Sequence, residues 1–312
     1  MEAIRIEGLY KVFGQVQALD GLDLVIQPGS IFGFLGPNGA GKTTTIRILT
    51  GLARPTRGQA WVGGFDILTQ GNQISRLTGY LPEEPLFYSW MTPREFLEYS
   101  GKLFGLTPET LDKRIPELLD LAGLSAAAKR RIGGFSRGMR QRLGLAQALI
   151  NQPKILLLDE PASALDPAGR REVLELIKEM RGICTVMMST HILADVERVC
   201  DRVGIIANGR LVAEASQEEL LERYAVPAFE IEIDPVSQNE LPAWAENLRS
   251  LPWILDVTTD SLSARVVVSD VDTAKRELLA TTVQSRLILS RYEVARPSLE
   301  DIFLHLTGEP KP

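Results

Sequence analysis

The stretch Ile31-Phe32-Gly33-Phe34-Leu35-Gly36-Pro37-Asn38-Gly39-Ala40-Gly41-Lys42-Thr43-Thr44 joins an apolar strand to a glycine-rich loop. Glycines let successive backbone N–H groups converge on phosphate oxygens, Lys42 adds a positive charge, and the Thr43 hydroxyl is a ligand that Mg²⁺ accepts. The run from Thr44 to Leu49 favours a helix directly after the loop, and Gly51 ends it. The sequence therefore predicts a phosphate-binding loop for ATP or GTP.

Size and composition favour a globular chain of two domains. The chain has 312 residues, of which 45% are hydrophobic, and no apolar run approaches the roughly 20 residues that span a bilayer. The N-terminus carries no basic segment followed by an apolar one, so we expect a cytoplasmic protein without a secretory signal. A net charge of −6 argues against nucleic acid as the main partner. The spacing of Cys184 and Cys200 fits no metal or redox motif and predicts two buried, reduced thiols.

Strand and helix patterns alternate over the first two thirds of the chain. The run Ile155-Leu156-Leu157-Leu158 is apolar throughout, as is typical of a strand buried on both faces of a parallel sheet. Two further apolar strands are expected at 184–188 and 203–207, and a helical insert at about 85–150. The pattern predicts an α/β domain over residues 1–224.

A change of character at 225–228 marks the expected domain boundary. The residues after it read as strand, helix, strand, strand, helix and strand, which is the order of a ferredoxin-like fold. We therefore predict a small α+β domain over residues 228–308.

Two acidic residues follow the second buried strand. Asp159 and Glu160 suit phosphoryl chemistry, because one carboxylate can hold a metal ion while the other deprotonates or orients an attacking water. Further upstream, Phe135-Ser136-Arg137-Gly138-Met139 precedes a helical pattern with Ser136 as the N-cap. Such a capped helix end can bind an anion, although an ordinary cap would explain it equally well.

Together these motifs resemble the nucleotide-binding subunit of an ATP-binding cassette (ABC) transporter, over residues from about 2 to 224. The resemblance implies a P-loop NTPase fold with an antiparallel β subdomain and a helical insert. It also implies that Phe13 stacks on adenine, that Gly36 to Thr44 form the Walker A loop, and that Ser136 to Met139 form the signature motif. Asp159 then ends Walker B, and Glu160 is the catalytic carboxylate.

Three more positions take roles from the same resemblance. Asp166 in Ser163-Ala164-Leu165-Asp166 matches the D-loop, and His191 matches the switch histidine that contacts the γ-phosphate. Glu83 stands where the family's Q-loop usually has glutamine. The resemblance implies a catalytic and Mg²⁺-binding role for Glu83, and this implication is weaker than for the matching motif residues. The signature also departs from the usual Ser-Gly-Gly-Gln, since it reads Ser136-Arg137-Gly138-Met139.

The resemblance implies an ATP-hydrolysing subunit that uses ATP and Mg²⁺ and lies on the cytoplasmic face of the membrane. Two copies of the chain would sandwich ATP in a head-to-tail dimer, with Ser136 and Gly138 closing each site, and drive separate permease subunits. The motif variants and the run Arg296 to Phe303 resemble type-2 exporters of drugs, lipids or polysaccharides. The alternative is a soluble ABC ATPase of translation or DNA maintenance, but those usually fuse two cassettes or insert long coiled coils.

One cluster outside the nucleotide motifs predicts a docking surface. Pro85-Leu86-Phe87-Tyr88-Ser89-Trp90-Met91 is rich in aromatic residues and methionine, which are enriched at the cores of protein interfaces. We expect it to contact the permease. The competing interpretation is that these side chains pack the helical insert.

Overall fold

The computed structural model describes residues 2–163, 165–224, 227–285 and 287–295, together with 299, 302, 303 and 306. The chain divides into two compact units, Met1–Ser216 and Gln217–Pro312. This division groups α8 (Gln217–Tyr224) with the second unit, whereas the sequence prediction placed it in the first. Residues 225 and 226 at the expected boundary, and the expected end at 308, lie outside the described residues.

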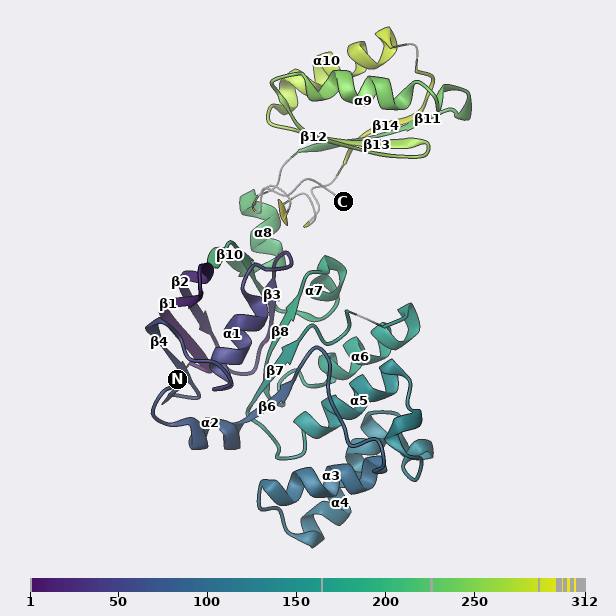
Figure 1. Cartoon of the computed structure of the whole chain (residues 1–312). Coiled ribbons are helices and arrows are strands. Elements are labelled where there is room, and N and C mark those ends of the chain that lie inside the picture. Colours follow the sequence, from purple (N-terminus) through teal and green to yellow (C-terminus); the bar gives the residue numbers. More distant parts are fainter. Residues whose placement is uncertain are drawn as a thin grey trace. The chain divides into compact units, whose positions relative to one another are not determined.

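A six-stranded sheet forms the centre of the first unit (Figure 1). Its order is β10-β9-β3-β8-β7-β6, and every neighbouring pair is parallel except β10 with β9. All residues of β3 (Ile31–Leu35) and β7 (Ile155–Asp159) are buried, which explains their uninterrupted apolar sequences. The other strands are β6 (Thr78–Leu81), β8 (Thr185–Thr190), β9 (Arg202–Ala207) and β10 (Arg210–Ser216).

A second, antiparallel sheet of order β2-β1-β4-β5 confirms the expected β subdomain. Period-2 alternation buries Ile4 and Ile6 in β1 (Ile4–Phe13), where they share one hydrophobic core with Phe32 and Phe34 of β3. The remaining strands are β2 (Val16–Ile26), β4 (Arg57–Val62) and β5 (Phe65–Asp66).

Helices surround the central sheet and make up the helical insert, and α3, α4 and α5 begin with side-chain N-caps. Thr92 and Glu95 form a capping box at the start of α3 (Pro93–Leu103). Ser136 caps α5 (Arg137–Ala148) by accepting a hydrogen bond from the Met139 N–H at 3.2 Å. The others are α1 (Lys42–Leu49), α2 (Gly71–Leu77), α4 (Pro108–Leu121), α6 (Pro167–Glu179) and α7 (Leu193–Val199). Among the described residues, no helix is long and apolar enough to cross a bilayer.

The second unit contains a four-stranded antiparallel sheet with two helices on one face (Figure 1). The strand order β12-β13-β11-β14 is that of the predicted ferredoxin-like fold. Phe229, Ile231 and Trp244 are among the residues of its own hydrophobic core. Its elements are β11 (Ala228–Ile233), α9 (Leu241–Arg249), β12 (Ile254–Asp260), β13 (Ser263–Val268), α10 (Val271–Gln284) and β14 (Leu289–Ala295).

Candidate nucleotide-binding site

The loop between β3 and α1 requires glycine at two crowded positions. A Cβ added to Gly36 would lie 2.4 Å from the carbonyl oxygen of Ile206, and one added to Gly41 would lie 2.6 Å from that of Ala18. Gly41 also has φ = +109°, a conformation that side chains with a Cβ rarely adopt. The turn therefore packs tightly against its neighbours and leads directly into the N-terminus of α1. A helix N-terminus presents free N–H groups to an anion.

Lys42 lies at the first position of α1 and is almost fully buried. Its ammonium donates hydrogen bonds to the carbonyl oxygens of Gly36 at 2.6 Å and Pro37 at 3.0 Å, and lies 3.3 Å from Glu160 Oε1. A buried ammonium needs such partners, because desolvation of an isolated charge is costly. The charge is thus held at the mouth of the loop, where phosphates would bind.

Asp159, the last residue of β7, is joined by a hydrogen bond to Thr43, which follows Lys42 in α1. Its Oδ1 accepts from the Thr43 hydroxyl at 2.9 Å and from the Ser189 hydroxyl at 2.8 Å. Burial raises the pKa of Asp159, and the two hydroxyl hydrogen bonds oppose that rise. A hydroxyl and a carboxylate are the hard oxygen ligands that Mg²⁺ prefers. Thr43 and Asp159 therefore fit a Mg²⁺ site.

Glu160 and His191 meet at the carboxyl ends of β7 and β8. Glu160 Oε2 lies 2.9 Å from His191 Nδ1, and the Glu160 backbone N–H donates to the Ser189 hydroxyl at 3.0 Å. Glu160 has φ = +47°, a strained value for a residue with a side chain, and such strain is commonly stored at functional sites. One carboxylate thus links the buried ammonium of Lys42 to the half-exposed imidazole of His191.

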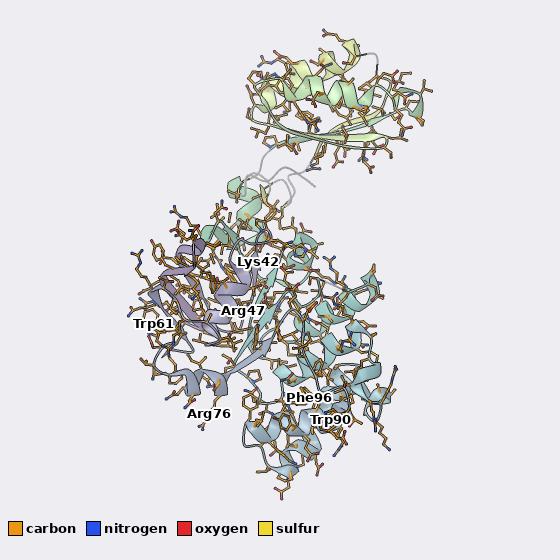
Figure 2. The ribbon with its side chains drawn as sticks, in the orientation of Figure 1. Lys42, Arg47, Trp61, Arg76, Trp90 and Phe96 are labelled. Carbon is orange, nitrogen blue, oxygen red and sulfur yellow. The ribbon has the colours of Figure 1, made fainter. Side chains whose placement is uncertain are left out.

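Lys42, Thr43, Glu160 and His191 line one pocket of about 220 Å³, and Asp159 adjoins it through its hydrogen bond with Thr43. The other residues that line the pocket are Asn38, Gly39, Gly41, Thr44 and Glu83. It brings together the predicted Walker A loop, the acid after β7, the histidine after β8 and the variant Q-loop residue. Figure 2 shows Lys42 at the start of α1. A wider hollow of about 730 Å³ lies over the sheet of the second unit, but it contains no P-loop residue.

Eight predicted site residues do not line this pocket, namely Phe13, Gly36, Pro37, Ala40, Ser136, Gly138, Asp159 and Asp166. Phe13 is 51% exposed, and the ammonium of Lys11 lies 4.4 Å from the centre of its ring. Ser136 and Gly138 lie at the N-terminus of α5, and Asp166 is the N-cap of α6 without a side-chain cap bond. Within one chain, the structure therefore assembles only part of the predicted site.

Sequence reasoning missed a buried network behind His191. Asp195 of α7 is 1% exposed and accepts a 2.6 Å hydrogen bond from Arg170 Nε of α6. Its other oxygen accepts from the Thr190 hydroxyl at 3.4 Å, and that hydroxyl accepts from the Ile192 N–H at 3.0 Å. Burial raises the pKa of Asp195, and Arg170 opposes the rise. The network holds the residues on both sides of His191, and no motif in the sequence indicates it.

Comparison with known proteins agrees with this geometry. The ABC transporter family profile matches residues 19–163, within which both the P-loop and the acid pair lie. The ABC transporter ATP-binding protein YxlF of Bacillus subtilis is 40% identical over 301 residues, covering 96% of this chain and 98% of the relative. This chain belongs to the ABC transporter ATP-binding proteins. The ABC ATPase assignment is thereby confirmed, and the alternative of translation or DNA maintenance is not supported.

Further matches define the type of ABC ATPase. Residues 216–307 match the C-terminal domain of DrrA1-3-like ATP-binding proteins. The daunorubicin resistance ATP-binding protein DrrA2 of Streptomyces coeruleorubidus is 35% identical and covers 98% of this chain and 95% of the relative. Among solved structures, the ATP-binding subunit of an ABC transporter superposes with a TM-score of 0.65 at 30% identity, covering 71% of this chain and 93% of that one. The ABC ATPase therefore has the DrrA-like two-domain organisation.

Proposed function

We propose that this ABC ATPase hydrolyses Mg-ATP to drive a separate permease that exports a drug-like, lipid or polysaccharide compound. One observation carries the proposal. A single pocket combines a buried lysine, a glutamate positioned by a histidine, and the Thr43 hydroxyl, which donates a hydrogen bond to Asp159 beside the pocket. The export direction rests on full-length similarity to a daunorubicin resistance protein.

Each residue of the pocket has a specific role in this proposal. Lys42 and the loop N–H groups bind the β- and γ-phosphates, while Thr43 and Asp159 hold Mg²⁺, which neutralises charge on the phosphates. Glu160 accepts a proton from the attacking water, and His191 orients Glu160 and contacts the γ-phosphate. Glu83 lines the same pocket and is positioned to sense the metal or the water.

Ser136 and Gly138 complete the site of a second copy in this proposal. They lie outside the pocket of their own chain, yet α5 presents a capped N-terminus that suits an anion. A two-fold dimer would place each signature motif over the other chain's P-loop and form two sites at once. Phe13 would then stack on adenine, and Asp166 would lie at the interface between the copies.

The permease would dock on the aromatic cluster after Glu83. Leu86, Tyr88 and Trp90 are 90%, 49% and 62% exposed, whereas Phe87 packs edge-on against Phe96 with ring centres 4.9 Å apart. The backbone of this segment is fixed, because the N–H groups of residues 132 and 133 donate to the carbonyl oxygens of residues 91 and 89. The cluster therefore presents exposed rings on an ordered backbone, and Figure 2 shows Trp90 and Phe96 in this helical part.

Replacing Tyr88 and Trp90 by alanine should uncouple hydrolysis from transport. We expect basal ATPase activity and melting temperature to stay close to wild type, because both rings are exposed, while transport falls by about tenfold or more. Phe96→Ala is the matched control for core packing, since this ring is 5% exposed and its loss should cost about 3–5 kcal/mol of stability. A comparable loss of stability in the Tyr88 and Trp90 variant would contradict the docking role.

Asp195→Asn should lower kcat roughly tenfold, equivalent to about 1.4 kcal/mol, with KM for ATP nearly unchanged. The reason is that Asp195 positions the residues flanking His191 without touching the P-loop. Arg170→Met should behave similarly, and Arg170→Lys should restore much of the rate. The matched control is Arg198→Met, because Arg198 pairs with the exposed Glu175 and also links α7 to α6. If Arg198→Met lowers kcat as much as Asp195→Asn does, the role of Asp195 is only structural.

Export is tested in cells that express the ABC ATPase together with the membrane protein that copurifies with it. Cells with the wild-type chain should tolerate more of an exported hydrophobic antibiotic than cells with Glu160→Gln. Inside-out membrane vesicles should accumulate the same compound only with ATP. Equal tolerance over a broad panel, with ATPase activity intact, would argue against export and leave the ATPase assignment standing.

A further inference from the structure

The sheet of the second unit ends in two edge strands, β12 and β14. Its helices cover one face, and the other face is open and concave. An edge strand exposes unpaired N–H and C=O groups that can pair with another chain, and proteins usually protect such edges with charges or irregular backbone. Both edge strands have one register shift with their neighbour, and the two edges differ in their charges.

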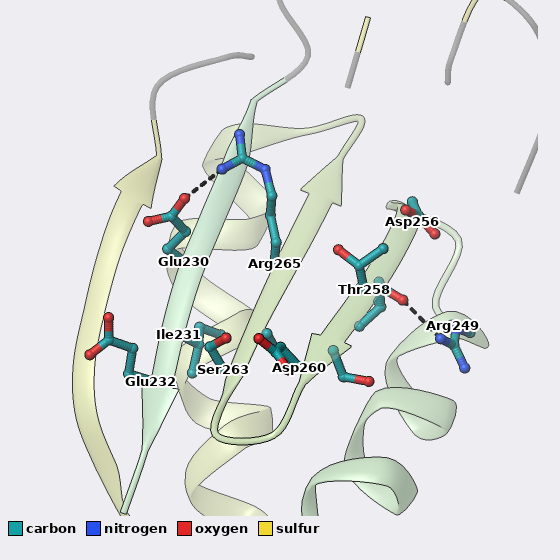
Figure 3. Close-up of a pocket in the computed structure, with 12 residues that line it drawn as sticks. Glu230, Ile231, Glu232, Arg249, Asp256, Thr258, Asp260, Ser263 and Arg265 are labelled. Carbon is teal, nitrogen blue, oxygen red and sulfur yellow. Dashed lines mark hydrogen bonds and ion pairs between the residues drawn. The ribbon is translucent and has the colours of Figure 1, made fainter. Parts of the chain in front are cut away.

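The β12 edge is protected against pairing with itself. Its open face carries Asp256, Thr258 and Asp260, as Figure 3 shows, and the register with β13 shifts between Ile254 and Asp256. No antiparallel alignment of two β12 strands puts opposite charges across from each other. The alignment centred on Thr258 would place Asp256 against Asp260 of the other copy, and like charges in that position are destabilising.

The β14 edge is self-complementary. Arg291 and Glu293 lie two residues apart on the open face. The register with β11 is regular from Arg291 to Ala295 and shifts between Arg291 and Leu289. Both charged side chains are about half exposed, at 49% and 44%, and Val294 is 53% exposed. Among the described residues, no strand pairs with the outer edge of β14.

The charges within one chain are unbalanced at Glu293. It lies directly across from Glu230 on β11, so two carboxylates face each other in adjacent strands. Arg265 forms an ion pair with Glu230. Arg291 forms ion pairs with both Glu293, at 2.6 Å, and Glu232, at 3.1 Å. An arginine on the outer side of Glu293 would give this carboxylate a second cationic partner.

We propose that β14 pairs antiparallel with β14 of a second copy, about a two-fold axis at Tyr292. In this register each Arg291 lies across from Glu293 of the other copy, which forms two ion pairs. Residues paired across two strands point to the same side of the sheet. The register between the two β14 strands can therefore shift only in steps of two residues. A shift of two residues in one direction would place Arg291 against Arg291, and a shift in the other direction would place Glu293 against Glu293. Both alternatives bring like charges together, so the charges select the register centred on Tyr292.

The same register also covers apolar surface. Val294 would lie across from Ser290, the residue at the register shift of β14, and the two Tyr292 rings would lie across from each other. The Tyr292 hydroxyl is buried without a hydrogen-bond partner among the described residues. The joined sheets would have eight strands and an isologous interface, in which both copies use the same surface. This contact is separate from the proposed nucleotide sandwich, and each can exist without the other.

Cysteine cross-linking tests the register in the full-length chain. Chains with Ser290→Cys are mixed with chains with Val294→Cys, all carrying Glu160→Gln, and oxidised with and without Mg-ATP. Directly opposed residues have Cβ atoms about 4.5–5.5 Å apart, close enough for a disulfide after small adjustments. The native Cys184 and Cys200 are buried, and burial raises the pKa of both thiols, so they should stay unreactive.

The mixture should form a cross-linked dimer, whereas Ser290→Cys alone should not. Two Ser290 positions would be separated by four residues along the strand, about 13 Å, which is beyond disulfide reach. No cross-link in either nucleotide condition, or equal cross-linking of Ser290→Cys alone, would overturn the proposal. If cross-linking fails while the two-chain ATPase complementation described in the Discussion succeeds with chains that keep Glu160, only the β14 pairing is overturned.

Charge reversal in the same assay tests the two ion pairs. Adding Arg291→Glu to the Ser290→Cys chain puts Glu opposite Glu293 and should slow cross-linking about tenfold. Adding Glu293→Arg to the Val294→Cys chain as well restores opposite charges in both pairs of residues 291 and 293. The cross-linking rate should then return to within about twofold of the rate without charge reversals. A reversal that changes nothing, or that the second reversal does not rescue, would contradict the charge-selected register.

Discussion

Glu160→Gln should abolish turnover while leaving ATP binding intact. We expect kcat to fall by about 10²–10⁴, because a positioned general base contributes that much and an amide cannot accept the proton of the attacking water. The substitution keeps the shape of the side chain, and the P-loop backbone that holds the phosphates is unchanged. Single-turnover hydrolysis measures the loss, and fluorescent-nucleotide titration measures the binding.

The structure adds a detail to this expectation. Glu160 Oε1 lies 3.3 Å from the Lys42 ammonium and Oε2 lies 2.9 Å from His191, so the amide also loses an ion pair. Lys42 keeps the carbonyl oxygens of Gly36 and Pro37 as partners, which should hold it in place. Glu175→Gln on the exposed face of α6 is the control and should be neutral. Near-normal hydrolysis by Glu160→Gln would exclude Glu160 as the base.

Mixing two inactive variants should recover ATPase activity if each site is shared between copies. Lys42→Ala disables the P-loop side, and Ser136→Arg blocks the signature side. In a mixed dimer one site loses both elements and the other keeps both. With random pairing of equal amounts, half the dimers are mixed, so independent sites should recover about a quarter of wild-type activity.

The control for this experiment pairs the Lys42→Ala chain with a chain that carries both substitutions. No site in that mixture is intact, so no activity should return. Steady-state phosphate release measured against the mixing ratio should peak at equal amounts for the first pair and stay flat for the second. Full activity of the Ser136→Arg chain by itself would rule out the shared site, since Ser136 would then have no part in hydrolysis.

The sequence predicted those features whose cause is local. Gly39 and Gly41 of the P-loop take φ values of +82° and +109°, which only glycine adopts readily, whereas Gly36 is required by its contact with the distant Ile206. Ser136 caps its helix as predicted, because a cap depends on residues within one turn. The strands β3 and β7 were predictable because burial on both faces requires uninterrupted apolar residues.

Contacts between distant segments depended on the sheet order, which no local pattern encodes. Because β8 lies between β3 and β7, Ser189 can bond Asp159, while Thr43 reaches the same carboxylate across 116 residues of sequence. The Arg170–Asp195 pair behind His191 arises only where α6 and α7 pack together. The sequence by itself determined which chemical groups are present and how each turn is built. Only the tertiary structure decided which groups meet, because long-range contacts follow from packing the whole sheet.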